Sequence, residues 1–185
     1  EIASFRIDEL FRQLAVEFAP LAQQRGLKLT FVPTTLAIHS DRRLLRRLLQ
    51  NLVSNAIKYT SKGGVLVGCR RRGKKLSLEV HDTGPGIPQA KQRIIFQEFQ
   101  RLEQGAKIAR GLGLGLSIVE RIARVLEHKL TVKSKVGRGS SFAVVVPVAP
   151  ALPAAAPGPQ PAPFAAAPLD GLTVLAIDNE PKILE

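Results

Sequence analysis

The sequence contains one cysteine, no methionine, no tryptophan and few aromatic residues, which make up 5% of the chain. A single cysteine, Cys69, excludes an internal disulfide framework and a zinc site built from several cysteines, and it fits a reducing compartment. No apolar run reaches the roughly 18 to 20 residues that a membrane-spanning helix needs, and no basic-then-apolar leader opens the chain. We therefore predict a cytoplasmic location without membrane contact, although a longer parent protein could still be anchored to a membrane.

Charge is strongly one-sided, with 27 basic and 15 acidic residues and a formal net charge of +12. This balance suits a polyanionic partner such as nucleic acid, acidic lipid, nucleotide phosphates or an acidic protein. The basic residues are scattered, and no RNP-type aromatic pattern, zinc knuckle or heptad repeat accompanies them. A solvated basic surface with one anionic ligand is therefore favoured, and direct binding of nucleic acid is not expected.

Composition divides the chain into three parts. Residues 1–148 mix apolar and charged residues as a globular domain does, whereas residues 149–168 contain nine alanines, seven prolines and no charge. Because proline removes amide donors and fixes φ, we predict that the second part is an extended linker. Residues 169–185 contain an apolar strand-like run followed by Asp178, Asn179 and Glu180, and we interpret them as the truncated start of a second domain.

Both helical and strand periodicities occur before the linker. Helices are predicted over residues 8–25, 41–59, 88–99 and 114–127, and strands over residues 27–32, 36–39, 65–70, 76–81, 130–134 and 141–146. Asp8 should cap the first helix, whose apolar stripe should contain Leu10, Phe11, Leu14, Phe18 and Leu21. Ser40 or Asp41 should cap the second helix. These elements predict an α/β fold of two layers, with a mixed sheet covered on one face by helices.

The second predicted helix presents two distinct faces. Leu45, Leu49, Leu52 and Ala56 should face a core. Asn51, Asn55 and Lys58 lie together on another side, at spacings of four and seven residues. Asparagine is a mediocre helix former, so this pair is not explained by helix propensity. The stripe is either a polar surface or a site where amides reach a hydrated cation and Lys58 reaches a phosphate.

Two glycine-rich segments follow. The first, DTGPGI, starts at Asp82 after a predicted strand, and its glycines allow backbone to approach a ligand closely. It could equally be a tight turn with a capping carboxylate. The second, GLGLGLS from Gly111 to Ser117, opens a helix whose free amides can bind an anion. Between them, the polar residues 100–110 suit either a mobile lid or an ordinary surface loop.

In this order and spacing, the motifs resemble those of sensor histidine kinases. NLVSNAIKYT resembles the N box, DTGPGI the first glycine box, IIFQEFQRL the F box, GLGLGLS the second glycine box and GRGSSF the third. The resemblance covers residues 5–147 and implies the Bergerat ATP-binding fold of the GHKL superfamily. It also implies ATP and Mg²⁺ as ligands and a flexible lid over the nucleotide.

The resemblance implies a role for each matching residue. Asn55 would hold Mg²⁺ with Asn51 beside it, Lys58 and Tyr59 would contact phosphate or ribose, and Asp82 would bind the adenine amine with Ser140 sharing a water. The remaining nucleotide contacts would come from Gly84, Gly86, Ile87, Arg101, Gly111, Leu112, Gly113, Leu114, Gly115 and Leu116. Phe96 and Phe99 would pack at the base of the lid.

Asn51 distinguishes this chain from relatives that hydrolyse ATP, because a glutamate stands at its place in those branches. An amide cannot accept a proton at neutral pH, so the site should hold ATP without efficient hydrolysis. The family transfers phosphate to a histidine on a preceding dimerisation domain. None of His39, His81 and His128 has that sequence context. We therefore predict a chain that binds ATP but does not phosphorylate itself.

The last residues, VLAIDNEPKILE, resemble the opening of a response-regulator receiver domain. Asp178 matches the first acid of that motif, but Asn179 replaces the second, which weakens a magnesium site there. The parent would then be a hybrid kinase, and its partners a dimerisation domain and a receiver or response regulator in two-component phosphorelay signalling. A GHKL-type ATPase and a nucleic-acid-binding module with a vestigial nucleotide site remain the alternatives.

Overall fold

The computed structural model describes residues 1–97 and 114–149. The chain divides into two units, Glu1–Pro153 and Ala154–Glu185, and the fold below is that of the described part of the first. Several predicted features lie outside the described residues. They are the lid, the linker, the receiver-like tail, and the site residues Arg101, Gly111, Leu112 and Gly113.

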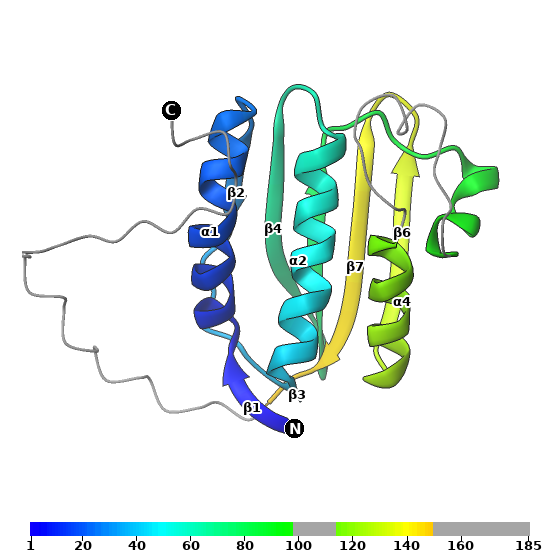
Figure 1. Cartoon of the computed structure of the whole chain (residues 1–185). Helices are drawn as coiled ribbons and strands as arrows, with labels where there is room; N and C mark the ends of the chain where they lie inside the picture. Colours follow the sequence, from blue (N-terminus) through cyan, green and yellow to red (C-terminus); the bar gives the residue numbers. More distant parts are fainter. Residues whose placement is uncertain (98–113, 150–185) are drawn as a thin grey trace, which may run out of the picture. The chain divides into compact units, whose positions relative to one another are not determined.

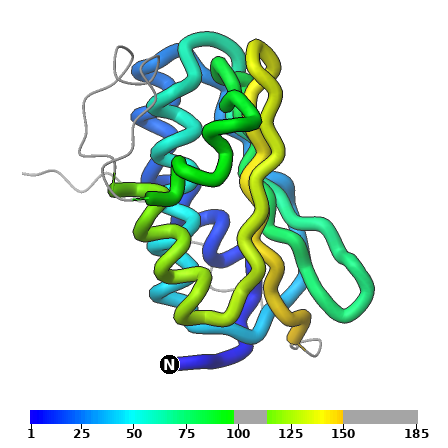
Figure 2. The backbone as a smooth tube through the Cα atoms, turned by 90° about the vertical axis from the view of Figure 1, so that its right-hand side faces the viewer, coloured from blue at the N-terminus to red at the C-terminus, as the bar shows by residue number. Residues whose placement is uncertain are grey.

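The predicted two-layer α/β architecture is confirmed (Figure 1). Five strands form one sheet in the order β2-β4-β5-β7-β6, in which β2 and β4 run parallel and the other neighbours antiparallel. The strands are β2 (Lys28–Phe31), β4 (Gly64–Arg72), β5 (Lys75–Asp82), β6 (Lys129–Lys135) and β7 (Gly139–Pro147). Helices α1 (Ile7–Gln24), α2 (Arg42–Tyr59) and α4 (Gly115–Val125) cover one face of this sheet (Figure 2).

A second, two-stranded sheet joins β1 (Ile2–Arg6) to β3 (Ala37–Asp41) in antiparallel register. The sequence analysis did not predict β1, because only Phe5 of this strand is buried and no alternation of apolar residues marks it. The backbone N–H of Ala149 donates to the carbonyl of Ala37, which places the end of the described chain against β3.

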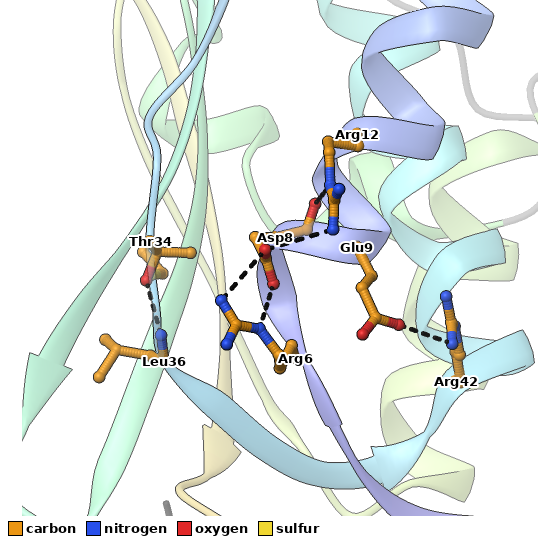
Figure 3. A network of polar contacts seen from close by, with 8 residues as sticks. Arg6, Asp8, Glu9, Arg12, Thr34, Leu36 and Arg42 are labelled. Carbon is orange, nitrogen blue, oxygen red and sulfur yellow. Dashed lines mark hydrogen bonds and ion pairs between the residues drawn. The ribbon is translucent and has the colours of Figure 1, made fainter. Parts of the chain in front are cut away.

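The start of α1 differs from the prediction (Figure 3). The helix begins at Ile7 and has no side-chain cap. Asp8 lies inside the first turn, where its carboxylate accepts hydrogen bonds from Arg6 at 2.9 Å and Arg12 at 3.4 Å. The Arg6 guanidinium therefore holds the pKa of Asp8 below its ordinary value. Leu21 is also outside the core, and Ala22 takes the buried position one residue later.

Helix α2 follows the prediction closely. Asp41 caps it by accepting from the backbone N–H of Leu44 at 2.9 Å. The predicted core residues Leu45, Leu49, Leu52 and Ala56 are all buried. Asn51 and Asn55 are only half-buried, which agrees with the prediction that they lie on another side of the helix.

The predicted helix over residues 88–99 is wrong within the described residues. The chain forms two short 3₁₀ helices instead, η1 (Gln89–Lys91) and η2 (Ile94–Phe96), and Phe99 lies outside the described residues. The ring of Phe96 packs edge-on against Phe142 at a centroid distance of 6.4 Å.

In the part of the chain that is described, no helix is both long and apolar enough to cross a bilayer.

Candidate functional site

The two asparagines of α2 lie beside the first residue of α4. A Cβ added to Gly115 would stand 3.1 Å from Asn55 Nδ2 and 3.5 Å from Asn51 Oδ1. Only a glycine therefore lets the backbone of α4 approach both carboxamides without displacing them. Asn51 is held by a bond from its Nδ2 to the carbonyl of Arg47 at 2.8 Å. The two motifs that the sequence separates by 60 residues thus meet at one point.

Lys58 and Tyr59 lie at the C-terminal end of the same helix. The Lys58 ammonium stands over the ring of Tyr59, 5.4 Å from its centroid, and its carbonyl accepts a bond from Arg25. Both side chains are half-buried. Asn55 precedes Tyr59 by one helical turn, about 6 Å along the axis. Helix α2 therefore presents amides, a cation and an aromatic ring within one short segment.

Asp82 ends β5, and two backbone segments hold its carboxylate. Its Oδ1 accepts from the backbone N–H of Gly84 at 2.9 Å and of Ser140 at 3.2 Å. Burial raises the pKa of Asp82, and the two backbone N–H donors lower it by less. Both backbone donors therefore bind Oδ1 of the Asp82 carboxylate.

The end of α2 also meets the first glycine segment. A Cβ on Gly84 would lie 2.9 Å from Asp82 Oδ1, 3.2 Å from the carbonyl of Tyr59 and 3.4 Å from Thr60 Oγ1. Thr60 is 2% exposed, and its hydroxyl has no hydrogen-bond partner in the described part of the chain. A buried hydroxyl without a partner is unfavourable by roughly 1 to 3 kcal/mol. Thr60 is thus a candidate that the sequence analysis missed, although it directly follows the asparagine–lysine motif.

The rest of the DTGPGI segment is bound to the β6–β7 hairpin. Gly86 has φ +72°, and a Cβ there would overlap the carbonyl of Lys135. The Ile87 N–H donates to Ser134 Oγ at 2.7 Å, and Ser134 Oγ lies 3.0 Å from Ser140 Oγ. The sequence analysis also missed Ser134. Its position opposite Ser140 on the neighbouring strand is the feature that could have indicated it. These contacts hold the loop against the hairpin beside Asp82.

The described site residues therefore form two groups joined by α2. Asn51 and Asn55 meet Gly115, flanked by Leu114 and Leu116, while Tyr59 and Thr60 meet Gly84 beside Asp82. A separate cavity of about 510 Å³ shares none of these residues; it is lined by Gln89, Gln92, Arg93, Phe96, Glu120, Leu130 and Val132. Each histidine has a hydrogen-bond partner outside these two groups: His39 contacts Ser4, His81 contacts Glu79 and His128 contacts Ser40.

Comparison with known proteins agrees with these motifs. Residues 40–150 match the family described as histidine kinase-, DNA gyrase B- and HSP90-like ATPase. The adaptive-response sensory kinase SasA of Crocosphaera subtropica is 38% identical over 148 residues, which cover 77% of this chain and 38% of that protein. The aerobic respiration control sensor protein ArcB of Escherichia coli K12 is 39% identical over 131 residues, 68% of this chain and 17% of that protein.

Solved structures give the same result. Full-length ShkA, crystallised with AMPPNP, matches with a TM-score of 0.73 and 31% identity over 92% of this chain and 34% of that one. The nucleotide-free catalytic domain of histidine kinase ThkA matches with a TM-score of 0.69 and 27% identity, over 81% of this chain and 99% of that domain. The chain thus spans well under half of the full-length relatives but nearly all of an isolated catalytic domain. It belongs to the histidine kinase-, DNA gyrase B- and HSP90-like ATPase family, as an ATP-binding catalytic domain of the sensor histidine kinase type.

Proposed function

We propose that this domain binds ATP with Mg²⁺ and donates the γ-phosphoryl group to a histidine on a separate dimerisation domain. The observation that supports this most directly is the close approach of Gly115 to both Asn51 and Asn55. It brings helix α4, whose N-terminus carries free amides and a positive dipole, to the carboxamides that suit a hydrated cation.

The described residues fit a purine nucleotide and a magnesium ion. Asp82 offers a carboxylate oxygen to the adenine amine, and the unpartnered hydroxyl of Thr60 lies beside it for the base or for a bridging water. No group of three or more His, Cys, Asp or Glu side chains is gathered among the residues described. The carboxamide oxygen of Asn55 could serve as a protein ligand of an Mg²⁺ ion whose other ligands are phosphate oxygens and water.

Each residue then has a distinct task. Asn55 coordinates Mg²⁺ with Asn51 beside it, while Lys58 and Tyr59 contact phosphate or ribose. Ser140 shares a water with Asp82, and Gly84, Gly86 and Ile87 shape the base pocket. Leu114, Gly115 and Leu116 adjoin the phosphates, and we assign Arg101, Gly111, Leu112 and Gly113, outside the described residues, to the lid side.

Asn51 favours transfer to a protein over hydrolysis. The bound ion neutralises charge on the phosphates, and positioned donors stabilise the transferring group. The Asn51 side chain cannot accept a proton from water, because a carboxamide is not a base at neutral pH. The incoming histidine therefore has to supply the nucleophile, and the three histidines of this chain are held by other contacts.

We further propose that the partners are a dimerisation domain and a receiver or response regulator. A solved complex joins the related kinase ThkA to the response regulator protein TrrA. The likeness of residues 174–185 to a receiver opening supports a hybrid parent with residues 149–168 as its linker. In such a hybrid parent, Asn179 would weaken the magnesium site of the receiver.

Calorimetric titration with a non-hydrolysable ATP analogue tests the proposal. The wild-type chain should bind the analogue more tightly with Mg²⁺ than with a chelator. Asn55→Ala should bind with an affinity that no longer depends on Mg²⁺, and Asp82→Asn should bind weakly with or without it. Absence of binding by the wild-type chain would refute a nucleotide site, and steady phosphate release from ATP would favour an ATPase instead.

A further inference from the structure

Two side chains from different segments hold the backbone of Ile87. Its N–H donates to Ser134 Oγ at 2.7 Å, and its carbonyl accepts from Gln92 Nε2 at 3.0 Å. Gln92 Nε2 also donates to the carbonyl of Ser134 at 3.0 Å. Both backbone polar groups of Ile87 are thereby bound, so neither peptide group beside it can turn without breaking a hydrogen bond. We call Gln92 and Ser134 the Ile87 clamp.

The carboxamide of Gln92 is oriented by its two partners. An amide NH₂ group has two donors, and here each one meets a carbonyl oxygen, so the reversed amide would set its own oxygen against both. The segment after Gln92 is anchored in the core by the buried Ile95 and by the ring of Phe96 against Phe142. Figure 2 shows the green segment that contains η1 beside β6. The clamp therefore has a support that does not depend on a nucleotide.

Ser134 also connects the clamp to Asp82. Its hydroxyl donates to the carbonyl of Gly139 at 2.9 Å and lies 3.0 Å from Ser140 Oγ. The backbone N–H of Ser140 in turn donates to Asp82 Oδ1 at 3.2 Å. A hydroxyl has one donor and two acceptor positions, and the bonds from Ile87 and Ser140 fill the two acceptor positions of Ser134. One side chain thus joins both ends of the DTGPGI segment.

We propose that Gln92 and Ser134 are positioning residues for the purine base and that they act through Ile87. This inference rests on the proposed function, in which Asp82 binds the adenine amine and Ile87 shapes the base pocket. A loop that is ordered before binding loses less entropy when the ligand arrives. The clamp should therefore strengthen the part of nucleotide binding that depends on the base. The part that depends on phosphates and Mg²⁺ at Asn55 should not need it.

The cavity described above lies against the clamp. Gln92 and Phe96 contribute to its lining, and its volume of about 510 Å³ is large enough for several waters. When the carboxamide is replaced, water entering from this cavity can hydrogen-bond the carbonyls of Ile87 and Ser134. The fold should therefore survive the loss of both bonds. The expected effect is a looser placement of Ile87, not unfolding.

Calorimetric titration of the full chain with ADP and Mg²⁺ compares the wild type with Gln92→Met, which keeps the length of the side chain but has no N–H donor. The matched control is Gln89→Met, the same replacement at an exposed position of the same segment. Tripolyphosphate with Mg²⁺, which has no base, is titrated in parallel. Exchange of the Ile87 amide hydrogen is followed by NMR, because Gln92→Met leaves the bond of that amide to Ser134 in place.

Gln92→Met should bind ADP about tenfold more weakly, which corresponds to ordering about one backbone residue on binding. Its affinity for tripolyphosphate should stay within about twofold of the wild-type value, and the Ile87 amide should exchange about tenfold faster. Gln89→Met should match the wild type in all three measurements. Equal ADP affinity in the two variants would overturn the proposal. An equal loss of ADP and tripolyphosphate binding in Gln92→Met would also overturn it, since the bonds would then support the fold in general.

Ser134→Ala gives a second test of the clamp. Alone it should also weaken ADP binding about tenfold, and together with Gln92→Met the loss should be about ten- to twentyfold, because both side chains hold the same residue. A loss of about a hundredfold in the double variant would show two independent effects and contradict a shared clamp. If the wild-type chain binds no ADP, the nucleotide site itself is refuted, whereas normal wild-type binding with unaffected variants refutes the clamp alone.

Discussion

Replacing Gly115 by alanine should weaken magnesium-dependent nucleotide binding without destabilising the fold. The new methyl carbon would lie 3.1 Å from Asn55 Nδ2, whereas non-bonded carbon contacts are optimal at about 3.5 to 4.0 Å. The obstructing atom is the end of a flexible side chain, so the Asn55 carboxamide moves by about 0.4 Å or more while the backbone stays. Alanine also favours helix over glycine by up to about 1 kcal/mol.

The displaced carboxamide is the expected source of the loss. Magnesium demands near-ideal geometry at about 2.0 to 2.1 Å from its ligands, so a shift of this size should cost about tenfold in affinity, or about 1.4 kcal/mol. Calorimetry with a non-hydrolysable ATP analogue, with Mg²⁺ and with a chelator, measures this. Urea unfolding without nucleotide measures stability, which should be unchanged or slightly raised.

Gly26→Ala is the matched control. Gly26 has φ +65° and no atom within 4 Å of an added Cβ, so alanine there meets backbone strain but no contact. It should lower stability by about 1 to 2 kcal/mol and leave nucleotide affinity unchanged. The opposite pattern, a stability loss in Gly115→Ala with unaltered magnesium dependence, would refute the reasoning about Asn55.

Three further results are expected. Burial raises the pKa of Asp82, so nucleotide affinity, measured by calorimetry, should fall as pH drops through that raised pKa. Protonation also removes the cost of burying the carboxylate, so the nucleotide-free fold should gain stability in urea titrations over the same pH range. Asp82→Asn should remove both trends. Burial lowers the pKa of His128 below its ordinary 6.5, so the unfolded chain takes up a proton that the folded chain resists. Stability should therefore fall as pH decreases below 6.5, and a shallower slope in His128→Gln would confirm this; an unchanged slope would contradict it. Asp41→Ala should cost about 1 kcal/mol of unfolding free energy through loss of the α2 cap, whereas an unchanged urea midpoint would count against the cap.

The sequence predicted well where periodicity and capping chemistry agree. Helix α2 has both a helical apolar stripe and a carboxylate at its start, and Asp41 and Leu45 lie as expected. Prediction failed where a local signal had a competing partner. Asp8 resembles a cap, but Arg6 and Arg12 bind its carboxylate within the first turn. Strand β1 was missed because its stability comes from pairing with β3, which is distant in sequence.

The site was predictable in its residue types but not in its supporting contacts. The glycines and asparagines belong to motifs that a single sequence displays, and the structure brings Gly115 to Asn51 and Asn55. The hydroxyls of Ser134 and Thr60 became visible only through the fold. Their positions depend on the register of β6 against β7 and on the approach of Gly84 to the end of α2.

A crystal structure of this chain with a non-hydrolysable ATP analogue and Mg²⁺ tests the central claim most directly. We expect one bound nucleotide, with its adenine amine at the carboxylate of Asp82 and its metal at the carboxamide oxygen of Asn55. Its phosphates should lie beside Gly115. A nucleotide bound elsewhere, or one whose base and metal do not reach Asp82 and Asn55 together, would contradict it.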